Sequence, residues 1–355
     1  MKVTLPSVLV YGANGYSAKL IIEELISRGI KPILSGRDES ALKKLSHKFD
    51  CEYRAVDLYD NEKLDSALNG VHTVLNCAGP FKFTAKEIME ACLRCKCNYL
   101  DITGEIPAMY LAFYLNQKAK EKGVVFLPSV GFDIIPTDCL AKRLSEQMPD
   151  ATHLKLGFSN KGGKISRGTW LTTLEFLGGT GRIRRDGKLI ESNIGEFTVD
   201  IKIKDFSFCG FSIPWGDVYS SYLSTKIPNV EVYIALPRLI VKSKSLLLFF
   251  LKILKVRLIK NIVAIFMKKT LTGPSKSKRD STKTYVWGRV ENSKGKMIEE
   301  VYRFMEGYNL TAKGAAECVE RVLNNTLKPG TYTPSLAFGS EFMDLFVIKK
   351  VYSSF

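Results

Sequence analysis

Short apolar runs alternate with segments of helical periodicity over residues 7–140, and this rhythm constrains the fold more than any other feature of the chain. The apolar runs have the length of strands and lie at 7–11, 31–35, 53–57, 71–77, 98–102 and 124–127. Helical patterns separate several of them, at 18–28, 39–49 and 84–92. Strands joined by helices of this length pair in parallel through right-handed crossovers. The sequence therefore predicts an α/β fold with an N-terminal Rossmann domain.

The second part of the chain has a different pattern. A single hydrophobic core rarely grows beyond about 250–300 residues, so a chain of 355 residues needs a second domain. Strand-like runs dominate there, at 197–203, 230–236, 284–290 and 297–304, before a helical pattern at 310–324. We expect the Rossmann domain to cover 1–140. A mixed α+β domain on a largely antiparallel sheet should cover 141–355 and shape the substrate site or a dimer interface.

A glycine-rich turn follows the first predicted strand directly. Gly12 allows a tight turn, Gly15 lets the backbone approach a pyrophosphate, and Ala18 permits close packing of helix on strand. The N-terminus of the next helix offers free N–H groups and a positive partial charge. We therefore predict that the turn binds a dinucleotide through Gly12, Asn14, Gly15, Tyr16 and Ser17. The alternative is a glycine turn without a ligand.

The end of the second predicted strand indicates which dinucleotide is bound. An NAD enzyme usually has an acidic residue there that binds the ribose 2′-hydroxyl, whereas this chain has Ser35-Gly36-Arg37. The Arg37 guanidinium can pair with a 2′-phosphate, and Ser35 can add a hydroxyl. These residues favour NADP(H) over NAD(H), although Asp38 could reach a ribose, and Arg37 could be only a solvated residue at a helix start.

Two further strand ends should border the cofactor, because ligands of open α/β sheets bind at the carboxyl ends of the strands. Asp57 ends the third predicted strand, near the expected adenine position. Cys77, Ala78 and Gly79 follow the fourth, where small residues let the backbone come close. Cys77 is interpreted as a packed cysteine rather than a nucleophile, because no histidine is near it in sequence.

These segments together resemble the saccharopine dehydrogenase-like oxidoreductases, and more closely the branch that includes trans-acting enoyl reductases. The resemblance rests on GANGYS at 12–17, SGR at 35–37, NCAGPF at 76–81, YLDITGE at 99–105, GFDIIPTD at 131–138, YLSTKIPNVEVY at 222–233, WGRV at 287–290, GYNLTA at 307–312 and GTYTPSLAFG at 330–339. It covers nearly the whole chain and implies a Rossmann domain, a mixed second domain and NADP(H)-linked reduction. It implies no particular substrate.

Polar residues after the fifth and sixth predicted strands are the candidates for proton transfer. We predict Asp101, Thr103 and Asp133 as catalytic residues, because a buried carboxyl beside the nicotinamide can carry a raised pKa and donate a proton. Glu105, Ser129 and Asp138 lie in the same segments. The alternative is structural, since Asp133 could brace the turn at Gly131 and Asp138 could cap a helix.

The positive charge of the chain is local. Of a formal net charge of +16, residues 238–283 carry +12, and within them 245–267 is apolar at helical spacing but interrupted by Lys252, Lys255, Arg257 and Lys260. This segment has no charge-free span long enough to cross a membrane. It predicts a basic amphipathic helix at an anionic membrane surface or, alternatively, one packed on the second domain. No module typical of nucleic-acid binding accompanies it.

The eight cysteines form no disulfide framework, and no secretory signal opens the chain, so we expect a cytoplasmic protein that contacts membranes peripherally. Cys92, Cys95 and Cys97 resemble half of a zinc site without a second half, so no metal is predicted. The hypothesis from sequence is an NADP(H)-dependent oxidoreductase acting on a hydrophobic or lipid-linked substrate, in which the second domain could form a homodimer interface. The alternatives are a non-catalytic nucleotide-binding scaffold at a membrane and a saccharopine-type amino-acid dehydrogenase.

Overall fold

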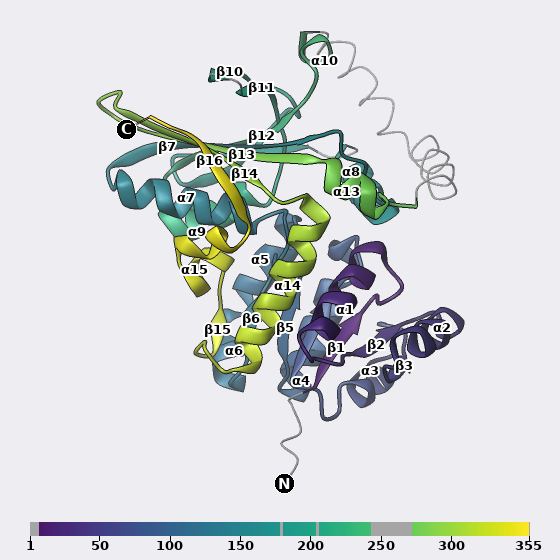
Figure 1. The fold of residues 1–355 in the computed structure, drawn as a ribbon. Helices are drawn as coiled ribbons and strands as arrows, with labels where there is room; N and C mark the ends of the chain where they lie inside the picture. Colours follow the sequence, from purple (N-terminus) through teal and green to yellow (C-terminus); the bar gives the residue numbers. More distant parts are fainter. Residues whose placement is uncertain (1–6, 178–179, 204–205, 243–271, 355) are drawn as a thin grey trace. The chain divides into compact units, whose positions relative to one another are not determined.

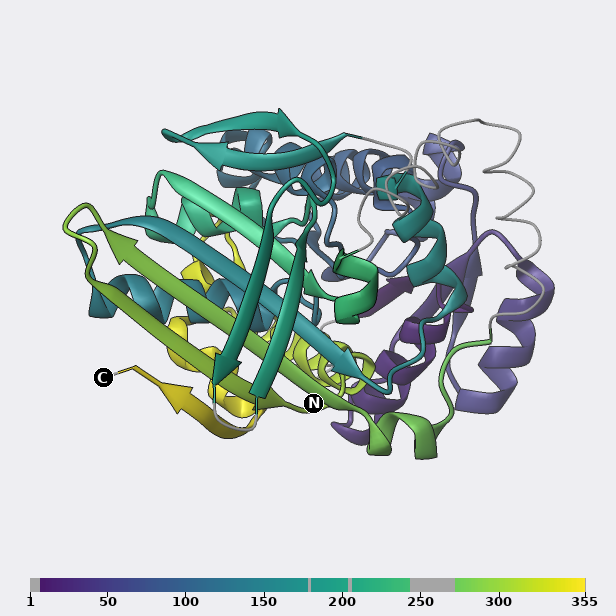
Figure 2. The ribbon, with the colours of Figure 1, turned by 90° about the horizontal axis from the view of Figure 1, so that it is seen from above.

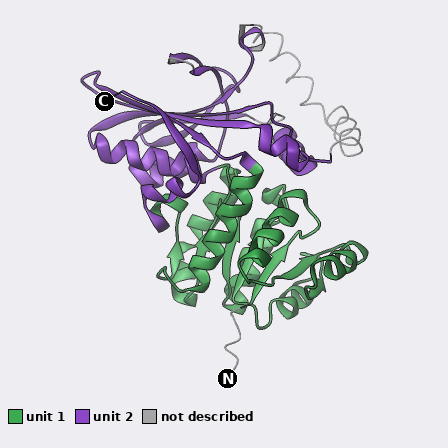
Figure 3. Ribbon diagram, viewed as in Figure 1, with its two compact units in different colours: residues 1–133, 308–337 green, residues 134–307, 338–355 purple. Residues whose placement is uncertain are grey.

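The chain divides into two compact units that do not follow the order of the sequence. The computed structural model describes residues 7–177, 180–203, 206–242 and 272–354 (Figure 1). Unit 1 comprises residues 1–133 and 308–337, and unit 2 comprises 134–307 and 338–355 (Figure 3). The first division between the units follows residue 133, whereas the sequence predicted it at 140. The expectation of two contiguous domains, however, missed the return of 308–337 to unit 1.

Unit 1 is built on one parallel sheet. Its strands are β1 (Val8–Tyr11), β2 (Ile33–Gly36), β3 (Tyr53–Ala55), β4 (Thr73–Asn76), β5 (Asn98–Asp101), β6 (Val125–Leu127) and β15 (Gly330–Thr331). They lie in the order β15-β6-β5-β4-β1-β2-β3, and every pair is parallel. This is the Rossmann order with one added strand, and the topological switch point lies between β1 and β4. The predicted fold of this part is confirmed.

Helices cover both faces of the parallel sheet. They are α1 (Tyr16–Ser27), α2 (Glu39–Phe49), α3 (Asn61–Ala67), α4 (Ala85–Cys95), α5 (Ile106–Tyr114), α6 (Asn116–Lys122) and α14 (Gly307–Leu323), with a 3-10 turn η1 (Phe81–Phe83). The chain reverses its direction across the sheet between β3 and β4. Right-handed crossovers therefore place α3 to α6 on the face opposite to α1 and α2. Figure 1 shows α14 beside α1.

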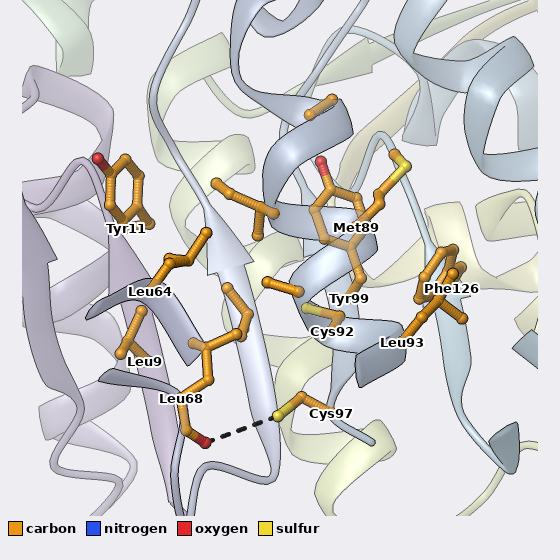
Figure 4. Packing of buried hydrophobic residues seen from close by; sticks show 14 of the residues in the cluster. Leu9, Tyr11, Leu64, Leu68, Met89, Cys92, Leu93, Cys97, Tyr99 and Phe126 are labelled. Atoms are coloured by element: carbon orange, nitrogen blue, oxygen red, sulfur yellow. Dashed lines mark hydrogen bonds between the residues drawn. The ribbon is translucent and has the colours of Figure 1, made fainter. Parts of the chain in front are cut away.

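The core of unit 1 forms where the strands meet α3 and α4. Leu9 and Tyr99 of the strands pack against Leu64 and Met89 of these helices (Figure 4). Val74 of β4 belongs to the same cluster, and all five side chains are nearly inaccessible to solvent. The strands are apolar on both faces because helices cover both faces, as parallel sheets require. This rigid core fixes the carboxyl edge of the sheet, where β1, β4, β5 and β6 end.

Unit 2 is a mixed α+β unit with a largely antiparallel sheet, as predicted. Its strands are β7 (Ala151–Lys161), β8 (Gly181–Arg185), β9 (Lys188–Ser192), β10 (Thr198–Ile203), β11 (Phe206–Ser212), β12 (Asn229–Ala235), β13 (Lys283–Asn292), β14 (Met297–Phe304) and β16 (Val347–Ser353). The main path runs β10-β11-β12-β7-β13-β14-β16, and β8 joins β12 to β9. Among the described pairs, β7 and β12 are parallel and the others antiparallel.

Both faces of the unit 2 sheet are packed, which two glycines permit. Helix α7 (Ile135–Gln147) lies so close to β13 that a Cβ at Gly288 would come within 2.7 Å of Leu144. Elsewhere β10 and β11 cross over other strands of the same sheet (Figure 2), and a Cβ at Gly157 would come within 2.6 Å of the Phe208 ring. Larger residues at either glycine would separate these layers.

The sequence predicts strands and turns over 153–236, and this prediction was wrong at two helices, α8 (Arg167–Leu177) and α9 (Asp217–Thr225). The other helices of unit 2 are α10 (Arg238–Lys242), α13 (Lys276–Ser281) and the 3-10 helix η2 (Ser340–Leu345), while α15 (Pro334–Phe338) spans a boundary between the units. Helices α8 and α9 are rich in Ser, Thr and aromatic residues, which are weak helix formers. Tertiary packing overrides such intrinsic preferences.

The basic apolar segment 245–267 lies outside the described residues. Within the ranges that the structure describes, no helix combines the length and the apolar composition that crossing a bilayer requires.

Candidate cofactor site

The turn after β1 is anchored to both neighbouring strands. The backbone N–H groups of Gly12 and Ala13 donate to the carbonyl oxygen of Ser35 in β2, at 2.8 and 3.0 Å. Gly12 has φ +79°, and a Cβ on it would lie 2.9 Å from the Ala78 backbone after β4. A side chain is excluded at Gly12 both by its left-handed conformation and by this close approach.

Helix α1 begins at this turn without a compensating side chain. Gly15 is its N-cap residue, no side chain accepts a capping hydrogen bond there, and the first turn contains no acidic residue. Helices α2 and α3, in contrast, begin with Asp38 and Asp60, whose carboxylates accept from backbone N–H groups of the first turn. The positive end of α1 is therefore suited to an external anion such as a pyrophosphate.

Arg37 and Asp38 lie side by side in sequence but in different chemical situations. Arg37 is exposed, and its guanidinium forms no hydrogen bond or ion pair with the described part of the chain. The Asp38 carboxylate accepts from Ala41 N and Ser40 Oγ, both at 3.0 Å, and these bonds lower its pKa. Asp38 thus caps α2, while Arg37 presents a cation that no described acidic residue neutralises.

Two other residues predicted at the adenosine end differ in accessibility. Ser35 is fully buried, and its hydroxyl donates to the Arg54 carbonyl oxygen at 2.8 Å, so the side chain braces β2 against β3. Asp57 is exposed just after β3. Burial, with the nearby Asp57 charge, raises the Tyr11 pKa to about 12, while Arg37 acts in the opposite direction. Arg37 and Asp57 are therefore both close enough to Tyr11 to affect its ionisation.

The segment after β4 closes the other side of the turn. Cys77 N donates to the Tyr11 carbonyl oxygen at 2.8 Å, which extends the pairing of β4 with β1. Ala78 is held from both sides, because its N–H donates to Asn76 Oδ1 and its carbonyl accepts from Thr84 Oγ1. Gly79 is exposed. Burial raises the pKa of the Cys77 thiol, so it stays neutral, as expected of a packed cysteine.

Asp101 joins the ends of β5 and β6 through a satisfied hydrogen-bond network. Its Oδ1 accepts from Thr103 N at 2.9 Å and from Ser129 N at 2.8 Å, while Oδ2 accepts from Tyr99 Oη at 2.7 Å. Burial raises the Asp101 pKa to about 6 despite these bonds. Because every described bond of this carboxylate fixes backbone or a core tyrosine, its geometry favours the structural alternative.

Thr103 and Glu105 continue this network towards η1. Thr103 Oγ1 accepts from Glu105 N at 2.9 Å. The Glu105 carboxylate in turn accepts from the backbone N–H groups of Phe81 and Lys82, at 2.8 and 2.9 Å. Thr103 is fully buried and Glu105 nearly so. The segment after β5 therefore holds the segment after β4 in place.

Asp133 is, beside Asp101, a second carboxyl of this edge with a raised pKa. It ends the β6 loop, which we define as residues 128–133, and is half-buried. A Cβ on Gly104 would lie 3.1 Å from its side chain, so it packs directly on the segment after β5. Burial and the charge of Glu105 raise the Asp133 pKa to about 7. A carboxyl with this pKa can donate a proton at neutral pH.

Helix α14 contributes to the same edge, which the sequence reasoning did not foresee. The Tyr308 ring meets the Tyr16 ring edge to face, with centroids 4.9 Å apart. At the other end of the two helices, Arg28 contacts Glu317 at 2.7 Å and Glu320 at 2.8 Å. The segment 307–312 had stood out only as a family motif, because nothing in the sequence shows that the chain returns to unit 1 there.

A cavity of about 200 Å³ lies at the opposite edge of the parallel sheet. It is bordered by His72, Asn98 and Val125, where β4, β5 and β6 begin, and by Asn325 after α14. Its polar groups already serve the fold, because Asn98 Nδ2 donates to the His72 carbonyl and Asn98 Oδ1 accepts from Val125 N. This cavity is separate from the candidate cofactor site.

No metal cluster is found among the residues that the structure describes, where no group of three or more His, Cys, Asp or Glu side chains is placed to hold an ion. The Cys97 thiol donates to the Val71 carbonyl at 3.1 Å, and burial raises its pKa to about 12. Cys97, one of the three neighbouring cysteines Cys92, Cys95 and Cys97, is therefore part of the packed core.

Comparison with known proteins shows what this chain is similar to. Residues 8–127 match the family model described as the saccharopine dehydrogenase NADP binding domain. A saccharopine dehydrogenase-like oxidoreductase of Mus musculus is 26% identical over 205 residues, or 50% of this chain and 47% of that protein. A lipid droplet localized protein of Caenorhabditis elegans is 27% identical over 147 residues, or 37% of this chain and 34% of that protein. A trans-acting enoyl reductase of Mycobacterium leprae (strain TN) is 28% identical over 139 residues, or 37% of this chain and 33% of that protein.

The fold has a solved counterpart. Saccharopine dehydrogenase (L-Glu forming) from Saccharomyces cerevisiae superposes with a TM-score of 0.66 at 13% identity, covering 98% of this chain and 100% of that chain. At this identity the likeness shows the fold alone. The chain spans about half the length of the first curated relatives it matches. Its nucleotide-binding segment and its curated relatives make the chain similar to the saccharopine dehydrogenase-like oxidoreductases, whose fold it shares.

Proposed function

We propose that unit 1 binds NADP(H) and that the protein is an NADP(H)-dependent oxidoreductase. The observation that carries the proposal is the uncapped N-terminus of α1 at the switch point, reached through Gly12 and Gly15. Its amide groups would hold the pyrophosphate. When bound, the reduced nicotinamide supplies a hydride, and the protein supplies orientation, a proton and exclusion of water.

The preference for NADP(H) over NAD(H) rests on Arg37 and Asp38. A ribose 2′-hydroxyl is usually bound by an acidic residue at this place. The Asp38 carboxylate is instead oriented as the cap of α2, where its Oδ1 accepts two hydrogen bonds. A 2′-phosphate needs a cation, and Arg37 is exposed without a described acidic partner. A planar guanidinium binds phosphate with two parallel hydrogen bonds. These two side chains together favour the phosphorylated cofactor.

The proposed reaction is reduction of a polarised double bond in a hydrophobic or lipid-linked substrate. Asp133 is the proposed proton donor, because its raised pKa keeps a useful fraction protonated near pH 7. Two relatives carry names that point to lipids: an enoyl reductase and a lipid droplet localized protein. In an enoyl thioester, the hydride would add to the β carbon and the Asp133 proton to the α carbon.

Nucleotide binding is the first test. Isothermal titration with NADPH should show binding by the wild-type chain and none by Gly15→Val, whose added side chain begins 3.2 Å from the Gly12 carbonyl oxygen and fills the approach to the pyrophosphate. Gly168→Val is the matched control, because a Cβ there meets nothing closer than Ser166 Oγ at 3.8 Å. Undiminished binding by Gly15→Val would remove the glycine turn from the site.

Turnover is the second test. NADPH oxidation should be followed with trans-2-enoyl thioesters of increasing chain length and, separately, NADP+ reduction should be followed with the amino acid saccharopine. We expect turnover with the thioesters that increases with acyl length. Turnover with saccharopine alone would instead identify a saccharopine-type dehydrogenase. Tight NADPH binding without turnover of any substrate would favour a nucleotide-binding scaffold.

A further inference from the structure

The first turn of α14 contacts two segments of the cofactor site that lie far from it in sequence. Tyr308 packs on Tyr16 at the start of α1. One turn later, Thr311 Oγ1 accepts a hydrogen bond from Phe132 N, in the β6 loop, at 3.0 Å. This bond is buried and joins residues 179 positions apart. Helix α14 thus touches both the phosphate-binding helix and the loop that carries Asp133.

The contact between Thr311 and the β6 loop is closely packed. A Cβ on Gly131 would lie 3.2 Å from Thr311 Cγ2 and 3.3 Å from Thr311 Oγ1. On its other side the loop meets the segment after β5, where Asp133 packs on Gly104. Ser129, in the same loop, has φ +67°, a conformation that costs energy for a non-glycine residue. A strained loop persists only where its surroundings hold it, and Thr311 supplies one of its backbone hydrogen bonds.

The β6 loop belongs to one half of the dinucleotide site. A Rossmann sheet consists of two mononucleotide-binding halves that meet at the switch point. Arg37 follows β2 and belongs to the adenosine half, whereas the β6 loop follows the last strand of the nicotinamide half. A residue that acts only through the β6 loop should therefore affect the nicotinamide without affecting the adenosine.

We propose that Thr311 is a positioning residue for the nicotinamide, because its side chain holds the β6 loop and thereby links α14 to the reducing end of the site. This inference rests on the proposed binding of NADP(H). It gives the return of 308–337 to unit 1 a functional reason: the helix that completes the nucleotide-binding unit also sets the position of the loop with the proposed proton donor.

Two probes separate the halves of the site. NADPH occupies both halves, whereas adenosine 2′,5′-bisphosphate lacks the nicotinamide. Thr311→Val keeps the shape of the side chain but leaves the Phe132 N–H without its acceptor, so we expect about a tenfold increase in the Kd for NADPH. The Kd for adenosine 2′,5′-bisphosphate should stay within about twofold of wild type. Thr311→Ser retains the hydroxyl and should restore NADPH binding.

Hydrogen–deuterium exchange provides a readout that needs no ligand. The Phe132 amide should exchange faster in Thr311→Val than in wild type or in Thr311→Ser, because its hydrogen bond is lost. Thr326→Val is the matched control. Thr326 lies just beyond the other end of α14, is exposed, and donates to the Arg321 carbonyl. This variant should change neither Kd and should leave the exchange of the β6 loop as it is.

A second pair of variants keeps the inference testable if Thr311→Val does not fold. Gly131→Ala places a methyl group against Thr311 and should weaken the binding of NADPH but not that of adenosine 2′,5′-bisphosphate. The double variant Gly131→Ala/Thr311→Ser lacks the Cγ2 methyl group of Thr311 and should recover part of the lost affinity for NADPH. NADPH binding by Thr311→Val equal to wild type, or a proportional loss of both probes, would overturn the inference alone. A wild-type chain that binds neither probe would instead refute the proposed function.

Discussion

Arg37 carries the choice between the two nicotinamide cofactors. Arg37→Ala removes the cation proposed for the 2′-phosphate and nothing that the described fold depends on. A hydrogen bond between charged groups contributes about 1.5–3 kcal/mol, so the Kd for NADPH should rise by about 10- to 100-fold. The Kd for NADH, which lacks this phosphate, should change by less than about threefold.

Lys43→Ala is the matched control for Arg37, because it also removes one exposed positive charge near the start of α2. It should change the affinity for NADPH only slightly, by the general loss of positive charge. Equal losses of NADPH and NADH affinity in Arg37→Ala would contradict the assignment of the 2′-phosphate.

Asp133 should make the stability of the chain depend on pH. Its pKa is raised to about 7, whereas an unfolded Asp has a pKa of about 3.9. The folded state therefore favours the protonated form, and this stabilisation is complete below about pH 4 and is lost as the pH rises through about 7. Asp133→Asn stays neutral, so relative to wild type its melting temperature should rise by a few degrees between pH 4 and pH 8.

The comparison between the variant and wild type isolates Asp133 from other groups. Asp101 shifts in the same direction, with a pKa of about 6, and contributes equally to both proteins. If the melting temperatures of wild type and Asp133→Asn differed by the same amount at every pH in this range, the pKa of Asp133 would not be raised. That result would remove Asp133 as the proposed proton donor.

At the residue level, the sequence predicted backbone requirements better than side-chain roles. Gly12 has the positive φ and the close approach that its motif predicts. Ser35 was predicted to offer a hydroxyl to the cofactor, but that hydroxyl lies buried against Arg54. Asp101, equally a candidate in the sequence, binds two backbone amides and a tyrosine. A motif determines the course of the chain, whereas the partners of a polar side chain come from strands distant in sequence.

Helices α1 and α14 are joined by an ion cluster centred on Arg28. Its guanidinium contacts Glu24 at 3.0 Å, Glu317 at 2.7 Å and Glu320 at 2.8 Å, and only 23% of its side chain is exposed. Arg28→Met keeps the apolar stem and leaves three carboxylates close together. We expect urea denaturation to show that the free energy of unfolding falls by about 1–2 kcal/mol. The loss is no larger because solvent screens these partly exposed charges.

Lys48→Met is the matched control, because Lys48 pairs with Glu23 on the surface with both side chains at least half exposed. Exposed ion pairs contribute little to stability, so the free energy of unfolding of this variant should fall by less than about 0.5 kcal/mol. Equal stability of Arg28→Met and Lys48→Met would mean that the ion cluster does not hold α14 against α1.

At the element level, periodicity located most strands and failed where local preference and tertiary structure disagree. Strand β14 and helix α2 begin and end where their patterns predict. Helix α9 was expected as strand and turn, because its serines, threonine and tyrosines favour other conformations. It is helical because it packs against α7 and β12. The helical conformation of α9 depends on the elements that it packs against, so it cannot be predicted from the sequence of the segment alone.

At the level of the whole molecule, the path of the chain between units is what the sequence concealed. Both units could be predicted from periodicity, but the sequence analysis assigned the helix at 310–324 to the second domain. Its placement in unit 1 follows from packing against α1 and from β15, which pairs with β6. The candidate cofactor site, which the sequence placed in the first 140 residues, is therefore contacted by residues from near the other end of the chain.

The charge of the whole molecule remains concentrated in one stretch, and we propose that 245–267 binds anionic membranes. Reversing Lys252, Lys255, Arg257 and Lys260 to Glu should abolish flotation with phosphatidylserine vesicles, because each cation near such a surface contributes about 1 kcal/mol. The control reverses four exposed lysines of unit 1, Lys86, Lys118, Lys120 and Lys122, and should still float. Wild-type flotation should weaken with salt and should be absent with phosphatidylcholine alone. Flotation that survives the first set of reversals would favour a segment packed on unit 2.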